Sequence, residues 1–265
     1  MSGILNIAVC QTDLVWEAPD VNIRRIDGFV DSLMLRSAPD LIVLPEFFTT
    51  GFTSDTSLAE DAGGPALGWM RGKASSTGSA IAGSVPVRDG GRVFNRFYFV
   101  YPDGTVRHYD KRHLFRMSGE NEIFTPGDSR HVVEYRGWRI AMSVCYDLRF
   151  PVWLRNIGND YDVMLNVASW PASRISAALQ LLHARAVENL SYFVFCNRVG
   201  DSPDDSYCGG SAVVDYKGRD IGEFLADEAM GPGGGFLCAG LDREQLGLFR
   251  EKFPAWMDAD RFEIQ

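Results

Sequence analysis

Short apolar runs alternate along this chain with stretches in which apolar residues recur every three or four positions. A short continuous apolar run is typical of a buried strand, whereas the wider spacing is typical of one face of a helix. We therefore predict strands at 4–10, 40–46, 80–87, 95–101, 105–111, 131–135, 139–145, 161–167, 192–196 and 211–216. The turn signal at 102–104 makes the strands on either side of it a hairpin.

Helical spacing is found from about residue 20, after Pro65, over 172–190 and over 242–252, with Asp20 as the candidate cap of the first helix. Two apolar stripes are interpreted as core-facing: Ile23, Ile26, Val30 and Leu33 in the first helix, and Ile175, Ala178, Leu179, Leu182, Ala186 and Val187 in the third. The alternation of strands and helices predicts an α/β fold with one main core, and we expect one domain over residues 1–265.

The candidate chemistry is organised around the run Arg139 to Pro151. Its apolar part predicts a buried strand that stops at Cys145, and Pro151 suits the first turn of a following helix. We expect the thiol at a strand-to-helix junction, where free backbone N–H groups bind ligands and can hold an oxyanion. Because a lone cysteine after an apolar strand is more often a core residue, Cys145 needs partners from elsewhere in the chain.

Two other predicted strands end in groups that a cysteine hydrolase requires, one in the carboxylate of Glu46 and one in the amine of Lys111. Each has a plainer interpretation. Glu46 can be a solvated carboxylate at a loop, and Lys111 can belong to a wet charged surface at 110–113. The apolar neighbours Tyr109 and Phe115 favour partial burial of the lysine.

These residues lie in blocks that resemble the nitrilase-type carbon–nitrogen hydrolases. The blocks are Leu44-Pro45-Glu46-Phe47-Phe48 with Gly51-Phe52, Tyr109-Asp110-Lys111-Arg112-His113-Leu114-Phe115 and Cys145-Tyr146-Asp147-Leu148-Arg149-Phe150-Pro151. Segments 184–189 and 209–215 are similar to later blocks of the family, so the resemblance covers nearly the whole chain. The tail at 251–256 resembles the omega-amidase branch.

The resemblance implies a fold and an assembly. The fold is a four-layer αββα sandwich in a single domain, with two sheets packed face to face and helices outside. The assembly is a homodimer or a higher homo-oligomer, in which the C-terminal helix and tail at roughly 242–265 contribute to subunit contacts.

The resemblance also implies a mechanism. Glu46 takes the thiol proton, Cys145 attacks an amide carbonyl, and a thioester intermediate is later hydrolysed. Lys111 and the backbone N–H of Tyr146 hold the oxyanion, and no metal or organic cofactor is required. A second glutamate in the loop after the lysine is expected to orient it; Glu120 is our choice, and Glu122 is the alternative.

The omega-amidase branch hydrolyses dicarboxylate monoamides such as 2-oxoglutaramate and 2-oxosuccinamate, and such substrates need a cationic group at the far end of the pocket. We choose Arg149, whose planar guanidinium suits a carboxylate, although a structural pairing with Asp147 or Glu188 is an equal alternative. Phe115, Trp170 and Tyr146 are candidate wall residues. Within the family, hydrolysis of N-carbamoyl amino acids or N-carbamoyl polyamines by the same triad is the alternative.

Composition and charge limit the partners and the cellular compartment that we expect for this chain. Hydrophobic residues make up 46% of the chain, and the formal net charge of −9 argues against a nucleic-acid partner. No apolar run is long enough to span a membrane, and the N-terminus shows neither a basic region nor a cleavage signal, so we expect a cytoplasmic protein. The five cysteines include no Cys-x-x-Cys pair, which disfavours a disulfide framework and a zinc site.

Other classes of protein fit less well. A Ser-His-Asp hydrolase is disfavoured because no GxSxG motif occurs, and a metallohydrolase because the four histidines are dispersed without HExxH. A non-catalytic binding protein would have no reason to retain Glu46, Lys111 and Cys145 together. Many relatives carry a glutamate just after the proline of the cysteine block, where this chain has Val152, and this difference concerns substrate choice.

Overall fold

The structure is a computed structural model that describes residues 3–260 and 262–263. One group of strands consists of β1 (Ile4–Gln11), β2 (Leu41–Val43), β3 (Glu60–Asp61), β4 (Ala80–Asp89), β5 (Arg92–Val100), β6 (Val106–Asp110), β14 (Glu223–Ala226) and β15 (Gly235–Asp242). The others are β7 (Val132–Tyr135), β8 (Trp138–Val144), β9 (Val163–Val167), β10 (Tyr192–Cys196), β11 (Val199–Asp201), β12 (Ser206–Cys208) and β13 (Ala212–Val214). The α-helices are α1 (Pro19–Arg36), α2 (Pro65–Thr77), α3 (Glu120–Ile123), α4 (Pro151–Leu154), α5 (Ile175–Asn189) and α6 (Arg243–Lys252).

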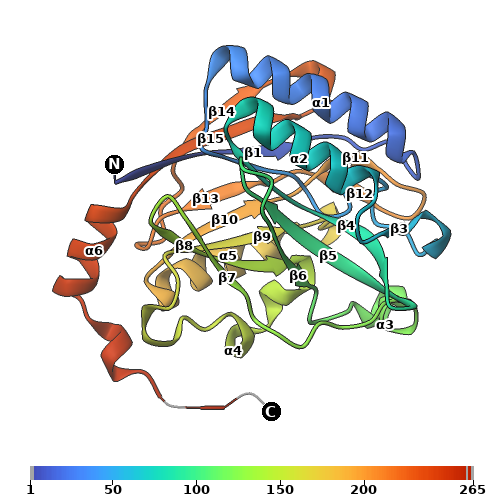
Figure 1. Ribbon diagram of the computed structural model, residues 1–265. Coiled ribbons are helices and arrows are strands. Elements are labelled where there is room, and N and C mark those ends of the chain that lie inside the picture. The colour runs from blue at the N-terminus through green and yellow to red at the C-terminus, as the bar shows by residue number, and fades with distance from the viewer. Residues whose placement is uncertain (1–2, 261, 264–265) are drawn as a thin grey trace.

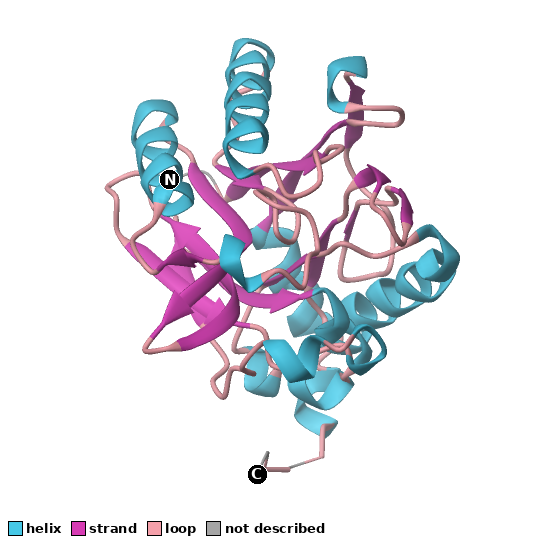
Figure 2. Cartoon of the chain, turned by 90° about the vertical axis from the view of Figure 1, so that its right-hand side faces the viewer, coloured by secondary structure: helices cyan, strands magenta, loops and turns pink. Residues whose placement is uncertain are grey.

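Two large sheets lie face to face (Figures 1 and 2). The first has the strand order β14-β15-β1-β2-β4-β5-β6, with β3 paired to β4. The second has the order β13-β10-β9-β8-β7, while β11 and β12 form a separate two-stranded ribbon. Strands β5 and β6 pair antiparallel, which confirms the predicted hairpin.

Strand β1 shows how the sequence sorts side chains between the layers. Ile7 and Val9 belong to the core between the two sheets, which also contains Val144 of β8. Ala8 and Cys10, the alternate residues, pack instead among residues of α1 and α2. Because successive side chains of a strand point to opposite faces, a strand that is apolar throughout must be covered on both sides.

Helices cover the outer face of each sheet. α1 and α2 lie over the first sheet (Figure 1), and α1 buries Ile26, Val30 and Leu33 as predicted. α5 packs against β10 of the second sheet through Ala178 and Leu182. This is the predicted αββα sandwich. Within the described residues, no helix combines the length and the apolar character that crossing a lipid bilayer would demand.

Details of two predicted helices were wrong. Asp20 does not cap α1: the cap position is Ala18, Pro19 occupies the first turn, and Asp20 lies inside the helix, where its charge favours the positive end of the helix dipole. In α5, Leu179 and Val187 are exposed rather than part of the core, because they lie at the edge of the apolar stripe.

Two strands of the first sheet were not predicted, β14 at its edge and β15 between β14 and β1. β15 pairs antiparallel with β1 along its whole length, with Ile7 opposite Ala239. Glycines at positions 235 and 240 interrupt its apolar pattern, so the segment does not look like a strand. The ribbon strands β11 and β12 were also missed, since each is only three residues long and polar residues surround them.

Candidate active site

Cys145 lies at the strand-to-helix junction that the sequence predicts. β8 ends at Val144, a 3₁₀ turn runs over Cys145–Arg149, and Pro151 occupies the first turn of α4. The φ angle of Cys145 is +44°, in the left-handed region that a non-glycine residue rarely adopts. Such a conformation costs on the order of 1 kcal/mol or more and persists only where surrounding contacts impose it.

Asp147 supplies those contacts. Its buried carboxylate accepts a hydrogen bond from the backbone N–H of Val144, the residue directly before Cys145, at 2.9 Å. The same carboxylate accepts from the Tyr109 hydroxyl at 2.7 Å and the His113 backbone N–H at 2.9 Å. Because Tyr109 and His113 flank Lys111, Asp147 ties the cysteine turn to the segment that carries the lysine.

Glu46 is fully buried and follows β2, which ends at Val43. Its Oε1 accepts hydrogen bonds from Asn95 Nδ2 at 2.8 Å and from Lys111 Nζ at 3.0 Å. Its Oε2 accepts from the backbone N–H of Ser169 at 2.8 Å. These donors fix the carboxylate in one orientation, so the interpretation of Glu46 as a solvated loop residue was wrong.

Lys111 is equally buried, and its ammonium also lies 2.9 Å from each carboxylate oxygen of Glu120. Glu120 opens α3 and accepts a further hydrogen bond from the backbone N–H of Phe115 at 2.6 Å. Glu122 is exposed. The structure therefore brings Glu120, rather than Glu122, to the lysine, and Lys111 does not belong to a wet surface.

The electrostatics of this group follow from burial and mutual charge. Burial raises the pKa of the Cys145 thiol well above its usual value, and the nearby Glu46 carboxylate raises it further. Burial alone would lower the pKa of Lys111, but the carboxylates of Glu120 and Glu46 outweigh it and raise that pKa. Burial likewise raises the pKa of Glu120 against the opposing charge of Lys111. The resting site therefore holds a neutral thiol beside a charged lysine.

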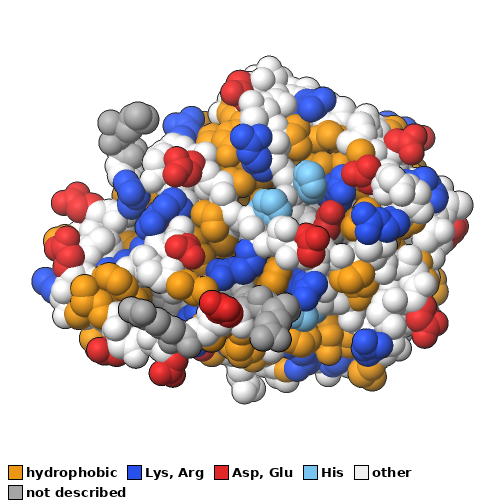
Figure 3. Space-filling view, turned by 60° about the horizontal axis from the view of Figure 1, so that its bottom comes forward, with side chains coloured by type: hydrophobic (Ala, Val, Ile, Leu, Met, Phe, Trp, Pro, Cys, Tyr) orange, Lys and Arg blue, Asp and Glu red, His pale blue; other side chains and the backbone are white. Residues whose placement is uncertain are grey.

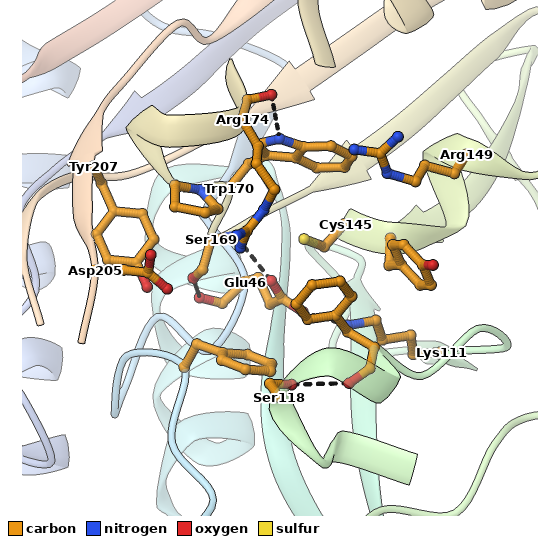
Figure 4. Close-up of a pocket in the computed structure, with 14 residues that line it drawn as sticks. Glu46, Lys111, Ser118, Cys145, Arg149, Ser169, Trp170, Arg174, Asp205 and Tyr207 are labelled. Atoms are coloured by element: carbon orange, nitrogen blue, oxygen red, sulfur yellow. Dashed lines mark hydrogen bonds and ion pairs between the residues drawn. The ribbon is translucent and has the colours of Figure 1, made fainter. Parts of the chain in front are cut away.

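A cavity of about 510 Å³, its open mouth included, gives access to these groups. Figure 4 shows the Cys145 sulfur pointing toward the centre of the residues that line it. Of the residues singled out from sequence, the cavity is lined by Glu46, Lys111, Phe115, Cys145, Tyr146, Arg149 and Trp170. Glu120 lies behind Lys111 and does not line it.

Aromatic side chains form one wall of the cavity. Phe115 and Tyr146 meet edge to face with ring centroids 5.0 Å apart, and Trp170 is buried, with its Nε1 donating to the Arg174 carbonyl at 2.9 Å. The guanidinium of Arg149 lies 5.2 Å from the Trp170 ring. The predicted wall residues thus lie at the cavity.

The alternative role of Arg149, a structural ion pair, is not what the structure shows. The Asp147 carboxylate is occupied by the donors described above, and Glu188 pairs with Arg155 and Arg185. Within residues 3–260 and 262–263, the Arg149 guanidinium has no ion-pair or hydrogen-bond partner. It stays free at the cavity surface.

Several lining residues were not predicted: Phe52, Ser118, Ser169, Pro171, Arg174, Asp205 and Tyr207. Ser169 and Arg174 follow the end of β9, so the rule that ligands bind beyond the carboxyl ends of strands could have indicated them. Tyr207 lies on β12 of the missed ribbon and Asp205 in the turn between β11 and β12, and neither segment has a strand-like pattern in the sequence. The described part of the chain contains no group of three or more His, Cys, Asp or Glu side chains arranged to hold a metal ion.

Comparisons with known proteins agree with this geometry. The carbon–nitrogen hydrolase family model matches residues 6–251. The omega-amidase YafV of Escherichia coli (strain K12) is 44% identical over 261 residues, covering 98% of both chains. A 2-oxoglutaramate amidase of Bacillus subtilis (strain 168) is 31% identical over 257 residues, covering 95% of this chain and 96% of the relative.

Solved structures give the same result for the fold. A carbon–nitrogen hydrolase superfamily protein of Xanthomonas campestris, with an arsenic adduct in its active site, superposes with a TM-score of 0.92 at 38% identity and covers 99% of both chains. Nit3 of Saccharomyces cerevisiae, a member of branch 10 of the nitrilase superfamily, gives a TM-score of 0.83 at 23% identity, covering 95% of this chain and 94% of Nit3. At that identity, the second likeness concerns the fold alone.

Proposed function

Because this chain belongs to the carbon–nitrogen hydrolase family, we propose that it is a cysteine amidase acting on the terminal amide of 2-oxo dicarboxylate monoamides. 2-Oxoglutaramate and 2-oxosuccinamate are the substrates we assign to it. The observation that carries this proposal is the buried contact among Glu46, Lys111 and Glu120 beside the Cys145 thiol, in a cavity that also exposes the free Arg149 guanidinium. The names of two relatives, an omega-amidase and a 2-oxoglutaramate amidase, support the substrate class.

Acylation begins with proton transfer. Glu46 accepts the thiol proton while Cys145 Sγ forms a bond to the amide carbon, because a neutral thiol with a raised pKa needs an adjacent base to become nucleophilic. The carbonyl oxygen becomes an oxyanion. Lys111 Nζ and the backbone N–H of Tyr146 stabilise it, since prealigned donors in a water-poor site act strongly on developing charge.

Ammonia then leaves. As the tetrahedral intermediate collapses, the carbon–nitrogen bond breaks and Glu46 passes its proton to the departing nitrogen, which leaves a thioester on Cys145. Glu46 next takes a proton from water, and the oxygen of that water attacks the thioester carbon. The carbon–sulfur bond breaks, the acid is released, and the proton returns to the thiolate. None of these steps requires a metal or an organic cofactor.

The remaining residues position the reactants. Glu120 aims the Lys111 ammonium, as its contacts with both carboxylate oxygens suggest. Arg149 binds the far carboxylate of the substrate, because a guanidinium offers parallel N–H groups that match a carboxylate. Phe115, Tyr146 and Trp170 form an apolar wall that excludes water from the carbon chain of the substrate.

A panel of substrates tests the proposal. Ammonia release is measured with 2-oxoglutaramate, 2-oxosuccinamate, glutamine, an N-carbamoyl amino acid, N-carbamoylputrescine and an aliphatic nitrile. We expect the two oxo-acid amides to give the highest kcat/KM. A higher value for either carbamoyl compound would contradict the substrate class while leaving the cysteine chemistry in place.

We further propose a cytoplasmic homodimer. All five cysteines are free, which suits a reducing compartment. Phe253, Met257 and Phe262 after α6 expose apolar side chains, and Figure 3 shows exposed apolar side chains between acidic and basic ones on the face nearest the viewer. Sedimentation analysis tests the assembly: we expect a mass of twice 29.5 kDa, and the mass of one chain would contradict it.

A further inference from the structure

Arg174 lines the cavity, and none of the steps above uses it. It ends the 3₁₀ turn Ala172–Arg174, which leads into α5, and it is half-buried. Its backbone carbonyl accepts a hydrogen bond from Trp170 Nε1, which links the turn to the cavity wall. Its guanidinium lies 5.2 Å from the centre of the Phe115 ring.

The Arg174 guanidinium differs from the structural arginines around it. Arg185, on the neighbouring α5, donates to the Leu148 carbonyl from Nε at 3.2 Å and from Nη2 at 3.0 Å, and it pairs with Glu188. In contrast, no residue in the described part of the chain accepts a hydrogen bond from, or forms an ion pair with, the Arg174 guanidinium. Its donors are available to a ligand.

Arg149 and Arg174 are alike in that neither guanidinium has a hydrogen-bond or ion-pair partner among the described residues. Each guanidinium rests on an aromatic ring of the cavity wall, Trp170 for one and Phe115 for the other, with 5.2 Å to the ring centre in both cases. In Figure 4 both arginines lie on the Trp170 side of Cys145, away from Lys111. A guanidinium held over an aromatic face keeps its planar N–H edge free for a carboxylate.

The charge at the bottom of the cavity explains why a second cation is useful. Glu46 and Glu120 are two carboxylates that face the single ammonium of Lys111. An anionic substrate that brings its amide to Cys145 therefore approaches an excess of negative charge. In a partly desolvated cavity such repulsion weakens binding unless cations near the mouth offset it.

We propose that Arg174 is a second anion-binding residue of this site, which together with Arg149 holds the carboxylate at the far end of the substrate. The inference rests on the proposed function and adds to it a specificity-determining residue. A substrate with one carboxylate beyond its amide then meets two guanidiniums, and an amide without that charge gains nothing from either. Selection among linear amides follows from charge at the far end.

The test compares two amides of about the same length, 2-oxoglutaramate and the uncharged hexanamide, in the full-length wild-type protein, in Arg174→Gln and in Arg116→Gln. Arg116 is the matched control, because it is an exposed arginine that does not line the cavity, and its replacement changes the net charge equally. We expect Arg174→Gln to raise KM for 2-oxoglutaramate about tenfold and KM for hexanamide about twofold or less. Arg174→Lys should restore part of the loss, since it returns the charge without the planar fork.

The outcomes separate this inference from the proposed function. Wild-type protein that does not prefer 2-oxoglutaramate to hexanamide would overturn the substrate class and the role of Arg174 together. A wild-type preference that survives in Arg174→Gln, or a loss no larger than that in Arg116→Gln, would overturn the role of Arg174 alone. Equal losses on both amides, with or without a lower melting temperature, would show a structural role and contradict the inference as well.

Discussion

Lys111 and Arg174 carry the same charge and line the same cavity, but their surroundings are opposite. The Lys111 ammonium is buried, and hydrogen bonds to Glu46 and Glu120 fix its position. The Arg174 guanidinium is half-buried, rests on an aromatic ring and has no polar partner among the described residues. At the bottom of the cavity the charged groups thus bind one another, whereas at its mouth the guanidinium N–H donors remain free.

This difference suits the bottom of the cavity to catalysis and its mouth to substrate choice. Groups that act on developing charge must be aligned before the reaction, which requires partners within the protein. Groups that choose a substrate must be free to exchange water for ligand, which partners within the protein would prevent. Changes at the bottom should therefore lower kcat for every amide, and changes at the mouth should alter KM for charged amides only.

The largest expected effect comes from removing the proposed nucleophile, Cys145. Cys145→Ala should abolish ammonia release from 2-oxoglutaramate and from hexanamide alike, a loss on the order of a thousandfold or more. Ammonia release and the melting temperature of the variant check this. Full activity in a folded variant would show that the reaction does not pass through the thiol.

Glu120→Gln should lower kcat roughly a hundredfold on both amides, because the lysine loses the partner that aims it at the oxyanion. Steady-state kinetics measure the effect. Glu122→Gln is the control, since Glu122 lies two residues away and is exposed. The proposed positioning role fails if the two variants have the same kcat.

The pH dependence of thiol alkylation tests the resting state at the bottom of the cavity. Burial and the Glu46 carboxylate raise the pKa of Cys145 above 9.0, so the thiolate is a minor species at neutral pH. Because its fraction grows as the pH rises toward that pKa, inactivation by iodoacetamide should accelerate about tenfold per unit between pH 7 and 9. A plateau below pH 8 would contradict the raised pKa of the Cys145 thiol.

Replacement of Asp205 should have the smallest effect, and it should lower KM where replacement of the arginines raises it. Its carboxylate lines the mouth together with Arg149 and Arg174. Asp205→Asn removes a charge that repels an anionic substrate, so KM for 2-oxoglutaramate should fall about twofold, less at high salt because exposed charges are screened. An increase in KM would mean that Asp205 assists binding instead of opposing it.

The sequence was sufficient for the bottom of the cavity because each of its residues ends a predicted strand or follows a motif. Glu46, Lys111 and Cys145 lie beyond apolar runs, and the sandwich brings those strand ends to one edge of two facing sheets. The sequence left open only the choice between Glu120 and Glu122, since the geometry of the folded loop decides which carboxylate reaches the lysine.

The mouth could be predicted only in part. Arg149 was indicated by its place shortly after Cys145, but its freedom from Asp147 and Glu188 depends on which donors those carboxylates already accept. Arg174 lies at a turn without a distinctive motif, and Asp205 lies in the turn between two strands too short to show strand periodicity. Contacts made by short, irregular segments depend on tertiary packing, which local pattern does not contain.

The division between the two regions is tested most directly by the ratio of kcat/KM for 2-oxoglutaramate to kcat/KM for hexanamide in the double variant Arg149→Met, Arg174→Gln. With both guanidiniums removed, the account predicts that this ratio falls at least a hundredfold while kcat on hexanamide stays within about threefold of wild type. A ratio equal to that of wild type, or a ratio preserved by equal losses on both amides, would contradict it.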